Sequence, residues 1–280
     1  MITAPPPPPP PPPTDQSEID RRKFLEVCAQ AGASIFVFGA VVCTTAKLML
    51  PSLAEARSPD GSDKDANEVI YGFLIDTTKC IGCGSCVRAC KAENNVPDGY
   101  YRTWVEQYAF YENGEVTVNS ASGGLNGFAD APQLDVPETD EPPVRGFFVP
   151  KLCNHCINTP CIQVCPVGAS YKTKEGVVLV DPQRCVGCGY CVQACPFGSR
   201  YLNPETRIAD KCTWCYHRIT KGLQPACVVS CPAKARIFGN VSDPKSEISQ
   251  LLASNRVQVL KSYLGTNPRT RYIGLDSEVI

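Results

Sequence analysis

The sequence predicts an α+β fold made of two similar units of short strands and short helices, with an insertion of loops and hairpins and a helical C-terminal tail. Three observations predict it. Sixteen of the 18 cysteines fall into four runs of four. The residues around these runs repeat along the chain. The stretches between and after the runs carry short strand, turn and helix signals.

The composition limits the class of protein. A length of 280 residues allows one or two domains. With 27 Lys and Arg against 28 Asp and Glu, the net charge is −1, and no basic excess indicates a nucleic-acid partner. An apolar content of 43% permits an ordinary core. The many cysteines nevertheless indicate that inorganic cross-links carry much of the fold.

The N-terminal segment, residues 1–19, is rich in proline. Pro5–Pro13 is an unbroken run of nine prolines, which lack backbone donors and favour an extended polyproline helix. This composition predicts a disordered spacer. Residues 57–67, further along the chain, are predicted to be a linker.

Residues 20–56 resemble a twin-arginine export signal. Arg21 and Arg22 precede an uncharged stretch, Val27–Ala46, and Ala54–Ala56 reads AEA, a suitable cleavage site. The alternative is an uncleaved membrane anchor, because about 20 apolar residues can span a bilayer. Several polar residues make the stretch a mediocre span, so we favour an export signal.

The segment CVGCGYCVQACP places four thiols close together. They are Cys185, Cys188, Cys191 and Cys195, and Pro196 follows the last. Disulfides among cysteines this close would be strained. Structural zinc usually takes two thiols from each of two separate loops. The spacing is typical of bacterial iron–sulfur proteins, in which three cysteines bind one cubane and the fourth binds its neighbour.

The chain contains four such runs, and each ends with a gap of three residues. Four complete runs favour iron–sulfur clusters over zinc and over disulfides. Cys28 and Cys43 lie in the signal region, and we expect neither to be a ligand. The runs are Cys80, Cys83, Cys86 and Cys90; Cys153, Cys156, Cys161 and Cys165; Cys185, Cys188, Cys191 and Cys195; and Cys212, Cys215, Cys227 and Cys231.

The repeat extends beyond the cysteines. LIDTTKCIGCGSC matches LVDPQRCVGCGYC, with Asp76 and Asp181 each four residues before a first ligand. CPVGASY at 165–171 matches CPFGSRY at 195–201, and CPAKARI at 231–237 is a weaker copy. These matches indicate two ferredoxin-like units, each made from a pair of runs. The spacing leaves open which runs pair.

Some neighbouring residues suggest how the sites are tuned. Pro166, Pro196 and Pro232 follow fourth ligands and lack an N–H that would need a partner. Lys91 takes this place in the first run, which indicates a more polar setting there.

Other residues beside the predicted ligands could have either of two roles. We expect His155 not to be a ligand, since four cysteines already complete its run. Trp214 and Tyr216 are expected to pack over a cluster rather than to mediate electron transfer. Four basic residues either offset cluster charge or lie on the solvated surface: Lys211, Arg218, Lys221 and Arg236.

The regular part of the chain is predicted at 68–280. VIYGFLID, residues 69–76, is typical of a strand. The insertion at about 91–150 has turn signals and no cysteine, which predicts hairpins and loops. A helix is expected at Ser246–Ala253, and an extended stretch at RYIGL, residues 271–275.

At these motifs the chain resembles the four-cluster iron–sulfur subunit of the dimethyl sulfoxide reductase type, over about 68–280 and including the tail LGTNPRTRYI. Relatives serve tetrathionate, polysulfide and thiosulfate reductases, periplasmic nitrite reduction, menaquinone reductase and a membrane complex linked to dissimilatory sulfite reduction. The motifs are specific for this family but not for one member.

The resemblance implies four [4Fe–4S] clusters and crossed pairing, first run with fourth and second with third. It implies these ligand sets: Cys80, Cys83, Cys86 and Cys231; Cys212, Cys215, Cys227 and Cys90; Cys153, Cys156, Cys161 and Cys195; and Cys185, Cys188, Cys191 and Cys165.

By the same resemblance, the chain is an electron-transfer subunit with no substrate chemistry of its own. Its expected partners are an integral-membrane quinone-interacting subunit and a molybdopterin catalytic subunit or a multihaem cytochrome c. Its expected location is the periplasmic face of the cytoplasmic membrane, peripheral or held by an N-terminal anchor. Two alternatives remain: a cluster-containing enzyme in its own right, and a zinc-stapled interaction module.

The twin-arginine route carries folded proteins, so clusters assembled in a reducing cytoplasm could be delivered to an oxidising compartment. Changing Arg21→Lys and Arg22→Lys together keeps the charge but alters the export motif. We expect this variant to stay in the cytoplasm with its clusters intact, measured by cell fractionation and iron content. Normal delivery of the variant to the periplasm would contradict the signal.

Overall fold

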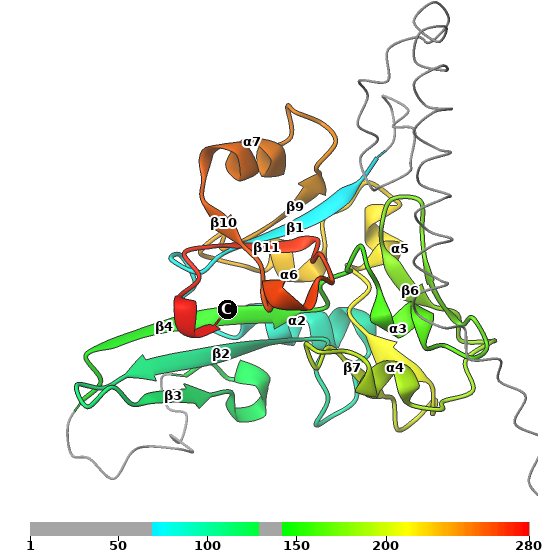
Figure 1. Cartoon of the computed structure of the whole chain (residues 1–280), viewed down its shortest axis with the longest axis horizontal. Helices are drawn as coiled ribbons and strands as arrows, with labels where there is room; N and C mark the ends of the chain where they lie inside the picture. Colours follow the sequence, from blue (N-terminus) through cyan, green and yellow to red (C-terminus); the bar gives the residue numbers. More distant parts are fainter. Residues whose placement is uncertain (1–68, 129–141, 280) are drawn as a thin grey trace, which may run out of the picture. The chain divides into compact units, whose positions relative to one another are not determined.

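A four-stranded sheet joins the two ends of the main domain (Figure 1). The computed structural model describes residues 69–128 and 142–279, which all belong to one unit, Lys64–Ile280. The strand order is β10–β11–β1–β9. In chain order these strands are β1 (Tyr71–Asp76), β9 (Arg236–Asn240), β10 (Val257–Gln258) and β11 (Thr270–Ile273).

Strand β1 lies in the middle of this sheet, and its sequence explains why. YGFLID is almost continuously apolar, and all its residues after Tyr71 are buried, as expected for a strand covered on both faces. It pairs antiparallel with β9, with Ile75 opposite Arg236, and parallel with β11, with Phe73 opposite Thr270. The predicted strand is confirmed.

Helix α7 (Glu247–Ser254) covers one part of this sheet. The Ser246 side chain accepts a hydrogen bond from Ser249 N at 3.2 Å and so caps the helix. Ile248 packs with Leu74 and Ile237 in a small apolar cluster. The predicted helix is confirmed within one residue. The C-terminal segment is not helical throughout, because β10 and β11 follow α7 and join the main sheet.

A second sheet, in the order β3–β2–β4, occupies most of the predicted insertion (Figure 1). Its strands are β2 (Thr103–Phe110), β3 (Val116–Asn119) and β4 (Arg145–Leu152). The rings of Tyr108 on β2 and Phe147 on β4 stack with centroids 5.3 Å apart. The 3₁₀ turn η2 (Ala121–Gly124) follows β3. Strand β4 ends directly before Cys153 and so leads into the second run of cysteines.

The remaining elements are short, in agreement with the predicted α+β class. Two hairpins separate the later runs, β5–β6 and β7–β8. The elements are α2 (Ser85–Asn94), α3 (Pro160–Gln163), β5 (Ser170–Lys172), β6 (Val178–Val180), α4 (Tyr190–Gln193), β7 (Arg200–Leu202), β8 (Ala209–Lys211), α5 (Tyr216–Ile219), α6 (Ala226–Val229), η3 (Ser262–Leu264) and η4 (Ser277–Val279).

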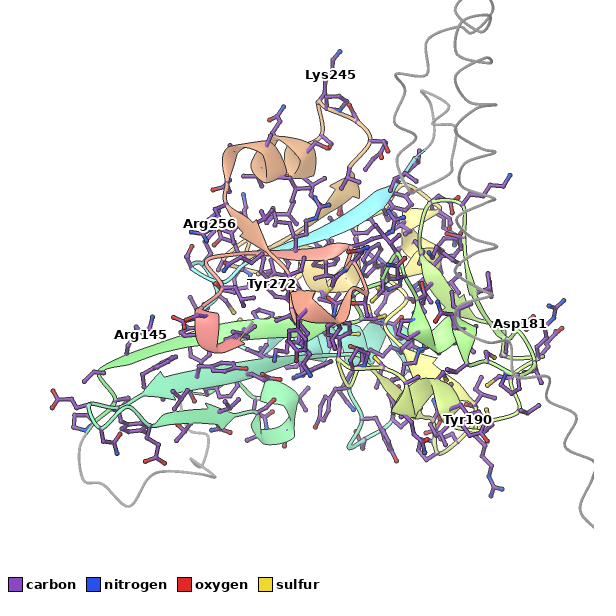
Figure 2. The ribbon with its side chains drawn as sticks, viewed as in Figure 1. Arg145, Asp181, Tyr190, Lys245, Arg256 and Tyr272 are labelled. Carbon is purple, nitrogen blue, oxygen red and sulfur yellow. The ribbon has the colours of Figure 1, made fainter. Side chains whose placement is uncertain are left out.

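The main core lies between the first sheet and the loops that carry cysteines. Trp214 is 1% exposed and contacts the rings of Phe73 and Phe238. Tyr272, from β11, is fully buried and lies in the interior of the side-chain view (Figure 2). Cysteines of the first, second and fourth runs pack in this main core, whereas Cys191 of the third run packs with Cys161 in a separate, smaller cluster.

Within 69–128 and 142–279, no helix has the length and apolar character needed to cross a membrane. The predicted export signal, with Arg21 and Arg22, lies outside the described residues, as do Cys28, Cys43 and the proline-rich segment.

Candidate iron–sulfur sites

Glycines shape the loops of the first and third runs. Gly82 and Gly84 have φ of 66° and 71°, and Gly187 and Gly189 have φ of 69° and 79°, a left-handed region that other residues rarely adopt. Gly84 and Gly189 are also the N-cap residues that directly precede α2 and α4. The third cysteine of each run therefore lies in the first turn of a helix.

The first group of thiols combines the first and fourth runs. Cys80, Cys83, Cys86 and Cys231 line one small cavity. Burial raises the pKa of Cys80 to about 11, and the neighbouring Cys86 and Cys231 thiols contribute to the rise. The pairing of β1 with β9 explains this meeting, because Cys80 follows β1 and Cys231 precedes β9.

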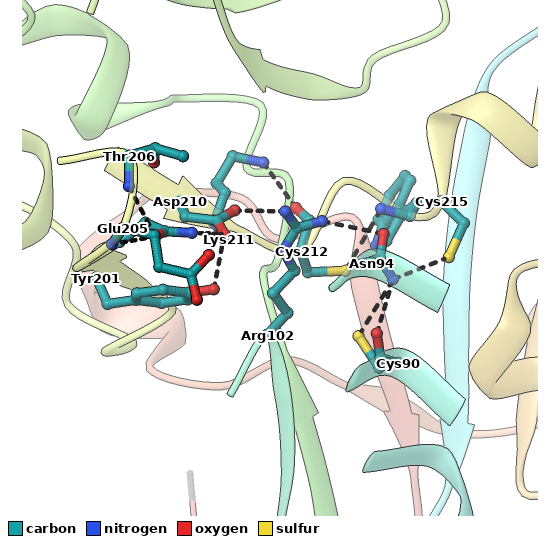
Figure 3. Close-up of polar contacts among 12 residues, drawn as sticks. Cys90, Asn94, Arg102, Tyr201, Glu205, Thr206, Asp210, Lys211, Cys212 and Cys215 are labelled. Atoms are coloured by element: carbon teal, nitrogen blue, oxygen red, sulfur yellow. Dashed lines mark hydrogen bonds and ion pairs between the residues drawn. The ribbon is translucent and has the colours of Figure 1, made fainter. Parts of the chain in front are cut away.

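The second group also combines the first and fourth runs. Burial raises the pKa of Cys90 well above its usual range, and the nearby thiols of Cys212, Cys227 and Cys215 raise it further. The side-chain nitrogen of Asn94 lies 3.6 Å from Cys90 Sγ and 3.8 Å from Cys215 Sγ (Figure 3). Helix α2, which carries Cys90, packs against α6, which carries Cys227.

The third group combines the second and third runs. Burial raises the pKa of Cys156 to about 12, and the thiols of Cys153, Cys161 and Cys195 contribute to the rise. Burial raises the pKa of Cys161 to about 11. Removing thiol protons here is unfavourable unless a cation or metal stabilises the thiolates.

The fourth group is the most open to solvent. Cys188 is exposed, whereas Cys191 is buried and packs in one cluster with Cys185 and with Cys161 of the third group. Cys165 precedes β5 and Cys185 follows β6, so the antiparallel pairing of these strands brings both to the same end of the hairpin. Tyr190, 58% exposed, lies beside this group at the periphery (Figure 2).

Buried cations lie among the thiols. Arg200, Lys211 and Arg236 are 4%, 1% and 2% exposed. Within the described part of the chain, none of the three makes an ion pair with a carboxylate. Burial opposes the charge of Arg236, but neighbouring thiols, that of Cys86 first, raise its pKa.

The hydrogen bonds of these cations are incomplete. Arg236 donates to Thr103 Oγ1 at 2.9 Å, yet its buried Nη1 has no partner among the described residues. Arg200 donates to Ser170 Oγ at 2.9 Å, and its Nε and Nη2 likewise have no partner in the described part of the chain. A buried charge is costly unless it is paired. Thiolate-bound clusters would supply that negative charge, so the residues present fit [4Fe–4S] clusters.

Two of the four basic residues named from the sequence, Arg218 and Lys221, are not buried among the thiols. Arg218 Nη1 pairs with Glu93 at 2.9 Å, and Lys221 is exposed. Lys211 donates to the carbonyl oxygens of Val178 and Cys212. The expectation of cluster-neighbouring charge therefore suits Lys211 and Arg236, and the surface alternative suits Lys221.

His155 and Trp214 form part of the packing between the groups. Val178 N donates to His155 Nδ1 at 2.8 Å, and the His155 ring stacks on Trp214 with centroids 4.0 Å apart. Burial lowers the pKa of His155 well below its usual range, so the ring is neutral. Trp214 N also lies 3.4 Å from Cys212 Sγ. The Tyr216 hydroxyl lies 3.5 Å from Glu175 Oε2.

In the residues that the structure describes, no three His, Cys, Asp or Glu side chains converge closely enough to hold a single metal ion. A cubane has a different requirement, because each of its four thiolates binds a different iron.

Sequence reasoning named Arg236 but missed other residues around the thiols. Arg200 lies five residues after a fourth cysteine, as Arg236 does at the equivalent position of the repeat, so the aligned segments carried this signal. Asn94 lies four residues after Cys90 on one helix, a spacing that also pointed to contact. The Arg102 contact with Asp210 joins distant segments and left no local signal.

Comparisons with known proteins match two parts of this chain to iron–sulfur domains. A model of the 4Fe–4S dicluster domain matches residues 144–241, and a model of the 4Fe–4S binding domain matches residues 71–92. The fold and the thiol groups therefore define an iron–sulfur electron-transfer protein of the ferredoxin type.

Curated relatives narrow the class further. The sequence is 42% identical to a tetrathionate reductase subunit of Salmonella typhimurium over 84% of this chain and 86% of that protein. It is 47% identical to a tetrathionate reductase subunit of Archaeoglobus fulgidus, over 73% and 82%. It is 33% identical to the arsenate respiratory reductase iron–sulfur subunit of a Shewanella species, over 72% and 95%. This protein belongs to the family of iron–sulfur subunits of these reductases.

The family and the sixteen cysteines in ferredoxin-like spacing provide for four [4Fe–4S] clusters. We expect removal of iron by a chelator under reducing conditions to unfold the domain, because it leaves Arg236, Arg200 and Lys211 buried without negative partners. Far-ultraviolet circular dichroism and limited proteolysis measure the loss of folded structure. An iron-free chain that keeps its native spectrum and protease resistance would contradict this coupling.

Proposed function

We propose that the chain relays electrons along four [4Fe–4S] clusters between a membrane quinone-reactive subunit and an exported redox subunit, which is a molybdopterin enzyme or a multihaem cytochrome c. The observation that carries the proposal is sixteen free cysteines, in four complete runs, within one compact domain. When bound, the clusters supply one-electron redox chemistry. The chain's own residues bury, orient and electrostatically balance them.

The proposed ligand sets follow the crossed pairing. The first set is supported by the shared cavity of Cys80, Cys83, Cys86 and Cys231. The second and third are supported by the mutual effects of their thiols on pKa. The fourth is supported by the β5–β6 hairpin. The second set is Cys90, Cys212, Cys215 and Cys227, the third is Cys153, Cys156, Cys161 and Cys195, and the fourth is Cys165, Cys185, Cys188 and Cys191.

The partners and location are part of the proposal. The relatives are named as subunits of reductases, which supports a place in a complex. Arg21 and Arg22 support export by the twin-arginine route. The proposed location is the periplasmic face of the cytoplasmic membrane, with the N-terminal segment either removed or kept as an anchor. No substrate conversion is assigned to this chain itself.

The alternative of an independent enzyme would need a cluster with an open iron. All four runs keep four cysteines, which favours electron transfer. The alternative of a zinc-stapled module is disfavoured by the matches to 4Fe–4S domains.

We expect the cluster-loaded, purified chain to be reduced by dithionite but not to turn over tetrathionate, polysulfide or dimethyl sulfoxide with a reduced viologen dye. In native membranes, low-temperature EPR should show the same clusters exchanging electrons with added menaquinol or menaquinone analogues. Turnover by the chain alone would show that it is an enzyme. Cluster signals that respond to neither the quinol nor the quinone would contradict the relay.

Crossed pairing predicts which cluster each fourth ligand affects. Because Cys90 lies one helical turn beyond Cys86 on α2, its thiol is directed to the neighbouring site. Cys90→Ser should perturb the cluster bound by Cys212 and leave the Cys80 cluster largely intact, whereas Cys231→Ser should do the reverse. EPR and iron analysis measure the loss, which is about four of sixteen irons for each cluster lost.

Cys28→Ser with Cys43→Ser is the matched control, since these two thiols lie outside the four runs. It should keep all the iron. The crossed arrangement is wrong if Cys90→Ser and Cys80→Ser remove the same EPR signal.

A further inference from the structure

Asn94, the last residue of α2, contacts two thiols from different runs (Figure 3). Its Nδ2 lies 3.0 Å from the Cys90 carbonyl oxygen, 3.6 Å from Cys90 Sγ and 3.8 Å from Cys215 Sγ. An amide nitrogen carries two hydrogens. One can go to the carbonyl oxygen, and the other is directed at the sulfur pair.

The orientation of this amide is fixed by a positive donor. Arg102 Nη1 donates to Asn94 Oδ1 at 3.0 Å. A guanidinium only donates, so the amide oxygen must face Arg102 and the amide nitrogen must face the thiols. A flipped Asn94 amide would place two donors together and remove this donor from both sulfurs.

Arg102 is itself held by a carboxylate. Its Nη2 lies 2.8 Å from Asp210 Oδ1, and the Arg102 and Asp210 side chains are only 17% and 13% exposed. Tyr201 donates its hydroxyl hydrogen to Asp210 Oδ2 at 2.7 Å. The series of contacts therefore runs from the thiols through Asn94 and Arg102 to Asp210, at a cavity that all three residues line (Figure 3).

Hydrogen bonds to cluster sulfurs favour the reduced state, because reduction adds negative charge. We propose that Asn94 raises the reduction potential of the cluster held by Cys90 and Cys215, and that the Arg102–Asp210 ion pair is the positioning pair that keeps its amide directed at the sulfurs. This inference rests on the proposed ligand set. It assigns Asn94 a role in setting one step of the electron relay.

The test uses the full chain with its clusters. Cys215→Ser first identifies the EPR signal of this cluster. Asn94→Leu, which keeps the size of the side chain and removes the donor, is then examined by redox titration. Because one hydrogen bond to a charged group is lost, we expect about a tenfold fall in the ratio of reduced to oxidised cluster at fixed potential, which is about 59 mV for one electron.

Ala92→Leu, an exposed change on the same helix, is the control and should shift no signal. Asn94→Asp is a second variant that keeps the shape of the side chain and replaces the donor by an oxygen. It should move the same signal in the same direction. An unchanged potential in an Asn94 variant that retains all four clusters overturns the inference and leaves the proposed function intact.

The positioning pair is tested without changing the net charge. Arg102→Met together with Asp210→Asn removes one positive and one negative charge. This double change should lower the potential when Asn94 is present and have little effect in the Asn94→Leu background. An equal shift in both backgrounds overturns the positioning role. If Cys215→Ser removes no EPR signal, the proposed ligand set of Cys90, Cys212, Cys215 and Cys227 is overturned instead.

Discussion

The pairing of β1 with β9 is the constraint on which the rest of the domain depends. It places Ile75 opposite Arg236, residues from opposite ends of the domain. The first run of cysteines follows β1, and the fourth run precedes β9, so this pairing brings the two runs together. The parallel pairing of β1 with β11 adds the C-terminal segment to the same sheet. Loss of this sheet would separate the first and fourth runs.

Charge is the second constraint, and it links the fold to electron transfer. Buried thiols favour their protonated form, and buried cations need a negative partner. Arg236 and Arg200 lie beside thiols of different groups, with polar atoms that no described residue satisfies. Thiolate-bound clusters would stabilise the deprotonated thiols and would also give the buried cations a negative partner. In the proposed relay, the buried cations and the Asn94 amide would also favour electron acceptance, because each would lie close to where negative charge increases.

The sequence predicted what depends on local spacing. The four runs, the strand at 69–76 and the helix near Ser246 each have a signal within a few residues. The extended stretch expected at 271–275 overlaps β11, whereas β10 was missed because it has only two residues and depends on its pairing with β11. The Asn94–Arg102–Asp210 contacts were missed for the same reason, since three separate segments supply them. Arg236 was named from the sequence, and Arg200 could have been found with it, because the two share one position of the repeat.

The central claim is that two crossed pairs of clusters connect runs far apart in sequence. Iron anomalous diffraction from crystals of the cluster-loaded chain tests it most directly. The account predicts four compact iron sites, with Cys90 bound to the cluster that Cys212, Cys215 and Cys227 also bind. An anomalous map with Cys90 on the same cluster as Cys80, Cys83 and Cys86 would contradict it.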